Sequence, residues 1–534
     1  MNSTATAHNS HHNVRPRLDA GRWVTMGVPA VLGIGIIYVL SQLIGDLQGI
    51  QNPALLPFLL LGLALFIALG FEFVNGFHDT ANAVATVIYT HSMPAPVAVV
   101  WSGMFNFLGV LLSSGAVAFG IVSLLPVELI LQVGSGAGFA MVFALLIAAI
   151  IWNLGTWYLG LPSSSSHTLI GSIVGVGIAN QLMQGNSGTS GVDWAQVEKI
   201  GNSLWMSPIF GFFAAAMLLL ILKLVVRAPA LYRAPEGNKP PPAWIRAILI
   251  STCAGVSFFH GSNDGQKGMG LIMLILIGVV PTAYALNASV KGSEIESFLT
   301  LTTTTQDALG HYVTLDAPEV ENARAAVTKF VAQRTFEADT MPALVKLTGE
   351  IAQQIKGHGS LGDLNAGEVR NVRNDMYLAS EAFNRILKSS KPAISVEDKD
   401  VLGAYQKVLN KSTRFIPDWV KVAVAIALGL GTMVGWKRIV VTVGEKIGKA
   451  HLTYGQGASA ELVAMATIGV ADGLGLPVST THVLSSGIAG TMAANGSGLQ
   501  WSTVRSLGLA WVLTLPASIM LSGFLFYVFM GLIG

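Results

Sequence analysis

The sequence predicts an all-α polytopic membrane protein with roughly ten to thirteen membrane segments and a soluble helical insert. Only 11% of the 534 residues are charged and 52% are hydrophobic, whereas roughly a quarter of the residues in a soluble domain are charged. The mean hydropathy is +0.59. The 59 glycines are many for a soluble enzyme but ordinary for packed membrane helices.

The composition also excludes several classes of protein. A net charge of +2 provides no basic surface for nucleic acid, and the hydrophobic content is too high for a disordered scaffold. The single cysteine, Cys253, excludes a disulfide framework and any CxxC metal or redox site. We therefore expect no nucleic-acid partner, no resident metal and no organic cofactor.

The chain begins with a polar tail, residues 1–22. His8, His11 and His12 could bind a metal ion there, but a solvated terminus is the simpler interpretation. Basic residues before the first apolar run indicate a cytoplasmic N-terminus. Residues 23–50 are predicted to hold an extra N-terminal membrane helix, because the run is long for a signal peptide and no cleavage site follows it.

The charges divide the remaining chain into two membrane blocks and one insert. Residues 287–417 contain 15 Lys+Arg and 16 Asp+Glu, which is more than half of all charges in the protein. We predict that this stretch is soluble. A first membrane repeat then occupies 51–228, and a second is formed by 229–286 together with 418–534.

Four polar, glycine-containing breaks lie between the apolar runs of these blocks. Short apolar segments that meet at such breaks are typical of interrupted helices. Non-helical backbone is tolerated at membrane depth only where it is buried in protein or lines a wet cavity. The predicted interruptions are residues 76–83, 162–168, 261–268 and 477–482.

The breaks recur as two matched pairs. Residues 75–83 and 260–268 both follow a long apolar run and share the pattern Gly-x-x-Asp. Residues 160–169 and 475–484 share Gly-Leu-Pro, one Ser, a His and a final Leu. A paired motif in two halves is a strong signal, whereas either motif alone would be weak.

The spacing within the two halves agrees once the insert is removed. Asp79 precedes His167 by 88 residues, and Asp264 precedes His482 by 218. The excess of 130 residues matches the length of the soluble insert. The two membrane blocks are therefore predicted to be duplicated halves.

These motifs resemble the signature of the PiT family of inorganic phosphate transporters, a repeated Gly-x-Asn-Asp segment followed by small residues. Gly261-Ser262-Asn263-Asp264 fits that pattern directly, whereas His78 stands at the Asn position of the first copy. The likeness is greatest to the bacterial low-affinity branch and extends over both membrane blocks. It implies two inverted repeats in the cell inner membrane and cation- or proton-coupled symport of phosphate by alternating access, with a metal–phosphate complex as a possible cargo.

The hydroxyl groups that follow the two prolines suit a phosphate site. Phosphate offers mainly acceptor oxygens, so a site that binds and releases it should supply neutral donors. Each group begins an apolar run, so backbone N–H groups of a helix N-terminus could also face the anion. The same hydroxyls could instead merely cap helices. The candidates are Ser163, Ser164, Ser165, Ser166, Thr168, Ser479, Thr480 and Thr481.

Asp79 and Asp264 are candidates for coupling. Intramembrane carboxylates are costly and usually functional, but they repel phosphate. Two like charges about 5 Å apart cost roughly 3 kcal/mol at an effective dielectric of about 20. The aspartates therefore need protons or bound cations (H⁺ or Na⁺) while the anion is present, unless they only cap half-helices. Asn75 and Asn263 could complete a cation shell with amide oxygens.

Lys267 occupies the position that matches Asn82, and both are candidate phosphate contacts. The lysine could also neutralise an aspartate, or it could extend to the membrane interface. Glu72 and Glu461 are further carboxylates in apolar segments. Glu461 is the weaker of the coupling candidates, because the matching position in the first half is Leu146.

His167 and His482 are the paired histidines of the two halves. They titrate in a range that suits a proton relay, although a histidine that donates one structural hydrogen bond fits nearly as well. His78 and His260 flank the aspartates without matching each other and rank lower.

Residues 287–417 carry helical patterns at 320–333 and 369–387, which predict a small helical bundle or a docking module. The family resemblance favours a cytoplasmic location for it. Lipid and phosphate are the expected partners, and a homo-oligomer is an open alternative to a monomer. Two other functions stay open: transport of another tetrahedral oxyanion such as sulfate, and a membrane-embedded phosphatase, for which no Cys nucleophile, zinc-ligand spacing or P-loop motif is present.

Overall fold

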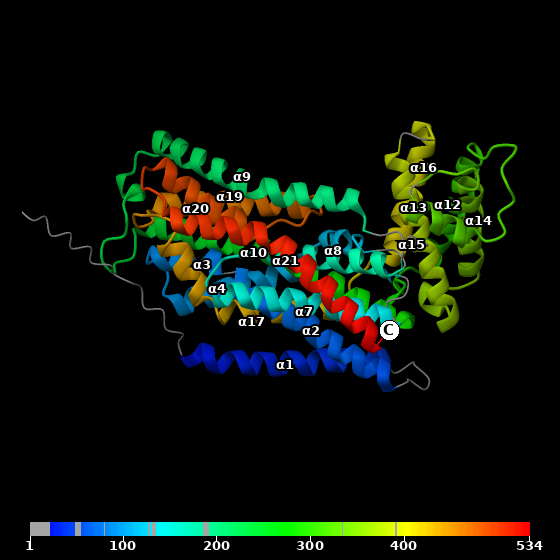
Figure 1. Ribbon diagram of the computed structural model, residues 1–534, viewed down its shortest axis with the longest axis horizontal. Helices are drawn as coiled ribbons and strands as arrows, with labels where there is room; N and C mark the ends of the chain where they lie inside the picture. The colour runs from blue at the N-terminus through cyan, green and yellow to red at the C-terminus, as the bar shows by residue number, and fades with distance from the viewer. Residues whose placement is uncertain are drawn as a thin grey trace, which may run out of the picture.

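The computed structural model is built from helices, and its longest helices run side by side (Figure 1). Within the described part of the chain, pairing between extended segments is limited to two isolated bridges. The described residues are 22–47, 55–79, 81–125, 129–130, 135–184, 192–333, 335–389 and 392–533. The polar tail with His8, His11 and His12 lies outside them.

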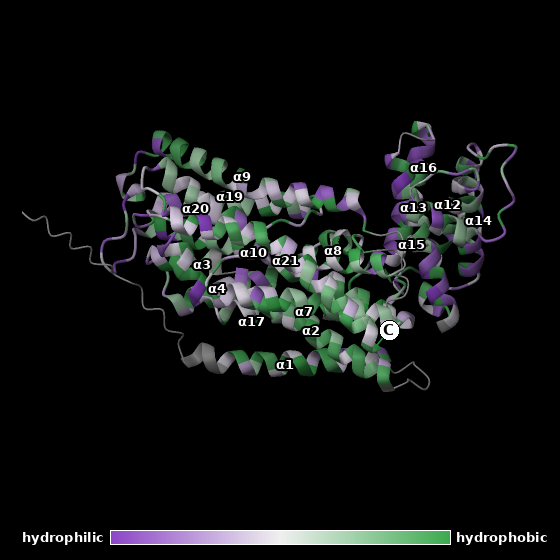
Figure 2. Cartoon of the chain, viewed as in Figure 1, coloured by the Kyte–Doolittle hydropathy of each residue, from purple (hydrophilic) through white to green (hydrophobic). Residues whose placement is uncertain are grey.

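The helices of the first membrane block precede residue 229. Most of them are apolar on several faces, as expected for elements that pack in lipid (Figure 2). They are α1 (Arg22–Leu47), α2 (Leu55–Asp79), α3 (Ala81–Tyr89), α4 (Ala95–Leu112), α5 (Ala116–Val122), α7 (Gly136–Tyr158), α8 (Ser165–Gln184) and α9 (Trp194–Val225).

The helices of the second membrane block lie on both sides of the insert in the sequence. They begin after the short 3-10 helix η1 (Pro229–Tyr232). They are α10 (Ala243–Val279), α11 (Pro281–Tyr284), α17 (Asp418–Met433), α18 (Lys437–Glu445), α19 (Tyr454–Gly473), α20 (Thr480–Ala494) and α21 (Trp501–Ile533).

Seven of the described helices are long and apolar enough to cross a bilayer. An eighth candidate is a pair of helices, one ending at Thr413 and the next beginning at Asp418, that is bent by 71°. This number is lower than the ten to thirteen membrane segments expected from apolar runs. The helices α17 and α20 have 16 and 15 residues, fewer than the roughly 20 that span the hydrocarbon core, while α8 and α19 carry many polar residues.

Two of the four predicted interruptions are non-helical. The helix α7 ends at Tyr158 and α8 begins at Ser165, and α19 ends at Gly473 and α20 begins at Thr480. Both connections place a glycine in the left-handed region, with φ of 68° at Gly160 and 66° at Gly475. A glycine has no Cβ penalty there. The two loops therefore leave their helices by the same backbone turn.

The predicted interruption at residues 261–268 is wrong, because α10 passes through it as one helix of 37 residues. The glycines of this stretch allow close packing instead of ending the helix. A Cβ on Gly261 would lie 2.2 Å from the carbonyl oxygen of Asn106, and one on Gly265 would lie 2.6 Å from Val110 Cγ2. For residues 76–83, α2 ends at Asp79 and α3 begins at Ala81, and residue 80 lies outside the described residues.

The packing of the two blocks is reciprocal. The helix α4 of the first block packs against α10 of the second, and α17 of the second packs against α2 of the first. In the same way α8 packs against α21, and α20 packs against α9 (Figure 1). Helices of each block therefore pack mainly against helices of the other block. The helices α4 and α17 also contact each other.

Five helices between residues 292 and 413 gather at one end of the long helices (Figure 1). Their polar faces stand out from the green membrane helices in Figure 2. Their apolar faces form a core in which the rings of Phe298 and Phe383 lie 5.4 and 5.7 Å from that of Tyr405. They are α12 (Gly292–Gly310), α13 (Ala323–Gln333), α14 (Thr340–Ile355), α15 (Ala366–Lys388) and α16 (Val396–Thr413), with the 3-10 helix η2 (Leu361–Asp363) between α14 and α15.

The ends of this five-helix segment are adjacent. The backbone N–H of Asn287 donates to the carbonyl oxygen of Ser412 at 2.9 Å. A segment whose ends meet can be inserted between two membrane helices without separating them. Along the flank of the membrane helices, α1 covers α17 (Figure 1), where a Cβ on Gly35 would lie 3.0 Å from Ile426 Cδ1.

Candidate functional site

Asp79 and Asp264 meet in the interior of the membrane blocks. Asp79 is the last residue of α2, and Asp264 lies inside α10, and both are buried. One carboxylate oxygen from each aspartate and one ring nitrogen of His260 lie within 4.8 Å of one another. The two copies of the Gly-x-x-Asp motif thus contribute to a single site.

Asp79 accepts hydrogen bonds from both proline-led segments. The Ser165 hydroxyl donates to one carboxylate oxygen at 2.6 Å, and the Thr481 hydroxyl donates to the other at 2.7 Å. His78 Nδ1 lies 3.0 Å from Asp79 Oδ1. Hydroxyl groups from the two halves of the sequence therefore converge on one carboxylate.

Lys267 is completely buried and pairs with Asp264. Its Nζ lies 2.6 Å from Asp264 Oδ1 and also donates to the Ser166 hydroxyl. Of the positions considered for this lysine, the structure shows the one beside an aspartate, inside the protein. Losing one partner of a buried ion pair costs about 3–5 kcal/mol, because the other charge stays desolvated.

The two proline-led segments begin their helices in the same way. The Ser164 hydroxyl accepts from the N–H of His167 at 3.2 Å, and the Ser479 hydroxyl accepts from the N–H of His482 at 3.2 Å. Such caps satisfy one of the free N–H groups in the first turn. Ser164 and Ser479 are thus engaged as caps, which is the alternative that the sequence left open for them.

The two segments also contact each other. The Ser166 hydroxyl donates to the carbonyl oxygen of Val478 at 2.8 Å. The rings of His167 and His482 lie 4.6 Å apart between centroids. The N-termini of α8 and α20 therefore meet beside the aspartates, with the paired histidines in contact.

Several candidates make local hydrogen bonds instead. Asn263 donates to the carbonyl oxygen of Leu476, and Thr168 donates to that of Ser164. The Ser163 hydroxyl lies 2.9 Å from that of Thr156. These side chains hold the loops in place.

Thr480 and Asn82 are the remaining candidates for contact with phosphate. The buried hydroxyl of Thr480 has no hydrogen-bond partner among the described residues, so it is available to a ligand. The side chain of Asn82 lies outside the described residues.

Glu461 and Asn75 lie beside the central cluster and not in it. Glu461 accepts from Thr86 on α3 and Thr252 on α10. Thr252 precedes Asp264 by twelve residues, which is about 18 Å along a helix. Asn75 donates to Glu72 at 3.3 Å.

Sequence reasoning ranked two contacting residues too low. His260 Nε2 lies 3.6 Å from Asp264 Oδ2, and its Nδ1 lies 2.8 Å from Asn106 Oδ1. His78 contacts Asp79 directly. The i,i+4 spacing of His260 and Asp264 places them on one helical face, a signal that the predicted break at 261–268 concealed.

One further carboxylate beside α10, Asp472, was missed altogether. Asp472 at the end of α19 accepts from Ser262 at 2.6 Å and from the Gln266 side chain at 2.7 Å. It stands four residues before the Leu-Pro pair of the second loop, and the matching residue in the first half is Trp157. The repeat comparison could not single it out, because that comparison favours residues shared by both halves.

The charge of the cluster is unbalanced. Asp79 and Asp264 carry two negative charges and Lys267 one positive charge when the histidines are neutral, so one negative charge remains. Carboxylate oxygens are the ligands that hard cations prefer in proteins. The arrangement can therefore hold a proton or a small cation, and it presents hydroxyl donors from two sides.

Comparison with known proteins shows similarity to phosphate transporters over most of the chain. Residues 75–522 match the family described as "Phosphate transporter family". The chain is 43% identical to "Low-affinity inorganic phosphate transporter PitA" of Escherichia coli strain K12, over 88% of this chain and 96% of that protein. It is 42% identical to PitB of the same strain, over 89% and 97%.

Proteins with lower sequence identity also match most of the chain. "Probable low-affinity inorganic phosphate transporter" of Bacillus subtilis is 29% identical over 87% of this chain and 96% of that protein. The solved structure of "The sodium-dependent phosphate transporter" is 18% identical, with a TM-score of 0.48, and covers 89% of this chain and 100% of that one. The relatives named here are transporters and not enzymes. Since the family match spans both membrane blocks and both copies of the aspartate motif, this chain belongs to the phosphate transporter family.

Proposed function

We propose that this protein carries out low-affinity transport of inorganic phosphate across the cell inner membrane, as symport with a cation or proton. The observation that carries the proposal is the meeting of Asp79, Asp264 and Lys267 with hydroxyl groups of both proline-led segments. Family membership supplies the substrate. The geometry suggests how a net negative pocket could take an anion.

Phosphate binds where hydroxyls and helix N-termini converge. The first turns of α8 and α20 direct backbone N–H groups and the positive ends of their dipoles toward the same region. Thr480 offers a buried hydroxyl without a partner among the described residues. Ser165, Ser166 and Thr481 offer further hydroxyls that can exchange a carboxylate or carbonyl acceptor for a phosphate oxygen.

Cation binding makes this pocket acceptable to an anion. The pocket already has one excess negative charge, and phosphate adds one or two more. Two like charges about 5 Å apart repel by roughly 3 kcal/mol at an effective dielectric of about 20. At least one proton or cation on Asp79 or Asp264 is therefore needed while phosphate is bound, which couples the two movements.

Lys267 exchanges partners during the cycle. In the absence of phosphate its charge neutralises Asp264. When phosphate binds, the ammonium group turns to the anion, and a cation or proton takes its place at Asp264. Departure of that cation restores the original pair and expels the anion.

The reciprocal packing of α4, α10, α2 and α17 supports an inverted-repeat arrangement. In such transporters one repeat rocks against the other around a fixed central site. The site proposed here lies between the halves, so each can expose it to one side of the membrane in turn.

Uptake of labelled phosphate into proteoliposomes, with pH and Na⁺ gradients imposed separately, tests this function. Concentrative uptake under one gradient identifies the driving ion. An added requirement for Mg²⁺ or Ca²⁺ indicates a metal–phosphate cargo. Equal competition by sulfate shows a broader oxyanion transporter, and release of phosphate from esters without uptake contradicts transport.

A further inference from the structure

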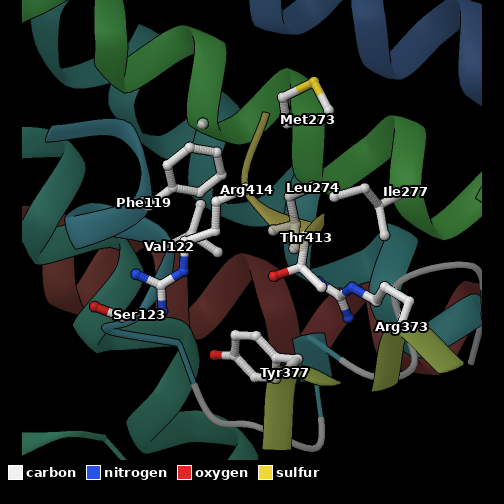
Figure 3. A pocket seen from close by; sticks show the side chains of 11 residues that line it. Phe119, Val122, Ser123, Met273, Leu274, Ile277, Arg373, Tyr377, Thr413 and Arg414 are labelled. Carbon is white, nitrogen blue, oxygen red and sulfur yellow. The ribbon is translucent and has the colours of Figure 1, made fainter. Parts of the chain in front are cut away.

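A small cavity lies where the five-helix segment meets the membrane helices. Its volume is about 30 Å³, and α5, α10, α15 and the end of α16 line it. Figure 3 shows that Phe119, Met273 and Leu274 form apolar parts of its wall, while Arg373 and Arg414 flank Thr413 in this view. Two arginine side chains thus border one small cavity.

Arg373 is buried and incompletely paired. Only 5% of it is exposed. Its guanidinium lies 5.0 Å from the ring centre of Tyr377, and Nη1 donates to the Asn374 side chain at 3.2 Å. Its Nε has no hydrogen-bond partner, and within the described residues no carboxylate forms an ion pair with it. A buried arginine without an anion is unusual, because burial of a charge is costly unless it is paired.

Arg414 adds a second positive charge and has only a partial counterion. It donates to Glu381 at 2.9 Å. Burial, together with repulsion from Arg414, lowers the pKa of Arg373 to about 10, so Arg373 remains positively charged at neutral pH. Among the described residues one carboxylate therefore pairs with Arg414 and none pairs with Arg373, so the cavity has an excess of positive charge.

We propose that this cavity binds a phosphate group, either inorganic phosphate or the headgroup of an anionic phospholipid, between Arg373 and Arg414. The planar guanidinium fork matches phosphate oxygens and can donate two parallel hydrogen bonds. A volume of 30 Å³ exceeds the roughly 10–15 Å³ that one water needs. The space therefore suits one compact phosphate group, free or at the end of a lipid headgroup.

This site is separate from the central one but is built on the same helix. Leu274 follows Asp264 by ten residues on α10, which is about 15 Å along the helix axis. A phosphate group held there would tie α15 and α16 to the helix that carries Asp264 and Lys267. The anion would therefore regulate the position of α10 and would not be the transported ion.

Binding of radiolabelled orthophosphate to the purified full-length protein, in nanodiscs of phosphatidylcholine, tests the inorganic source. We expect the double variant Arg373→Gln/Arg414→Gln to bind one phosphate fewer per chain than the unaltered protein and to keep the central site. Arg370→Gln is the matched control, because Arg370 is exposed on the same helix and does not line the cavity. Native mass spectrometry with added phosphatidylglycerol tests the lipid source, with one lipid fewer on the double variant.

If the double variant binds as much phosphate and as much phosphatidylglycerol as the unaltered protein, the proposal is wrong. Arginine labelling with phenylglyoxal makes the test independent of the fold of the variant. In the unaltered protein, phosphate or phosphatidylglycerol should slow modification of Arg373 and not of Arg370. Equal modification with and without either compound overturns the proposal.

Discussion

Lys267 determines how the central cluster is balanced. It is the one cation that contacts the described aspartates of the cluster, and both it and Asp264 have no exposed surface. Removing either charge of the pair would leave the other one buried without a partner, so the effects of the two substitutions on stability should not add. This dependence can be measured by comparing single and double variants.

Lys267→Met should destabilise the folded protein by about 3–5 kcal/mol, because Asp264 is left as an uncompensated buried charge. Adding Asp264→Asn should recover most of that stability but not phosphate uptake. Thermal unfolding in detergent and uptake into proteoliposomes check the two effects. Recovery of uptake by the double variant would contradict the partner exchange proposed for Lys267.

Asp79→Asn should remove concentrative uptake and leave folded protein in the membrane. The amide oxygen still accepts from one of the two hydroxyls of Ser165 and Thr481, and the amide nitrogen can donate to the other, but the amide can no longer take a proton or bind a cation as a charged ligand. The expected loss of uptake is at least about tenfold, equivalent to about 1.4 kcal/mol. Asp46→Asn is the control, since Asp46 is exposed on α1 and far from the cluster in sequence; equal loss in both variants would refute a coupling role.

At this scale the repeat singled out residues that the structure brings together. Asp79, Asp264 and the two hydroxyl-rich segments each have a counterpart at matching spacing, and they meet in one cluster. Asp472 and His260 were missed or ranked low for the opposite reason, since their partners in the first half have different chemistry. Function at a pseudosymmetric site can rest on the positions where the copies differ.

Helix packing depends on glycine at defined points of contact. On α2, a Cβ at Gly76 would lie 2.2 Å from the carbonyl oxygen of Leu428 on α17, whereas a Cβ at Gly70 would have no atom within 4 Å. The contact at Gly76 is with backbone, which cannot rotate away as a side chain can. The two glycines thus form a matched pair on one helix.

Gly76→Ala should lower the free energy of unfolding by about 1–3 kcal/mol through overpacking, whereas Gly70→Ala should change it by less than about 1 kcal/mol. Thermal unfolding of both variants in the same detergent measures the difference. Equal stability of the two variants would show that α17 can move away from α2 at little cost.

The elements also show where the sequence was misleading. Glycine next to polar residues predicted an interruption at 261–268, yet α10 continues because Gly261 and Gly265 admit α4 at close range. The loops before α8 and α20 were predicted correctly, because proline and positive-φ glycine leave the backbone little choice. Glycine alone does not distinguish a helix end from a helix contact.

The whole molecule combines two membrane blocks that pack reciprocally with one segment of five further helices. The high density of charges in 287–417 led to the prediction of a soluble insert, and the spacing of the repeats agreed with its length. The number of full spans was predicted less well, because apolar runs do not reveal which short helices stop inside the protein. Which short helices end inside the protein is decided by packing between the two blocks, and this packing joins residues that are distant in sequence.

Replacing residues 288–411 with a short Gly-Ser linker should leave the membrane part folded and able to take up phosphate. The hydrogen bond between Asn287 and Ser412 shows that a short linker can close the gap, and segments with adjacent ends tolerate removal. Phosphate uptake by the shortened protein checks this prediction. Failure of the shortened protein to reach the membrane would mean that the insert is needed for folding.

The continuity of α10 has a mechanical consequence. A helix of 37 residues extends about 55 Å, and it has no joint beside Asp264 at which one half could tilt alone. Any rocking of α10 that uncovers the aspartates must also move its far end, which lies beside Arg373 of α15 and Arg414 after α16. Opening of the central site would therefore be accompanied by a displacement of the five-helix segment.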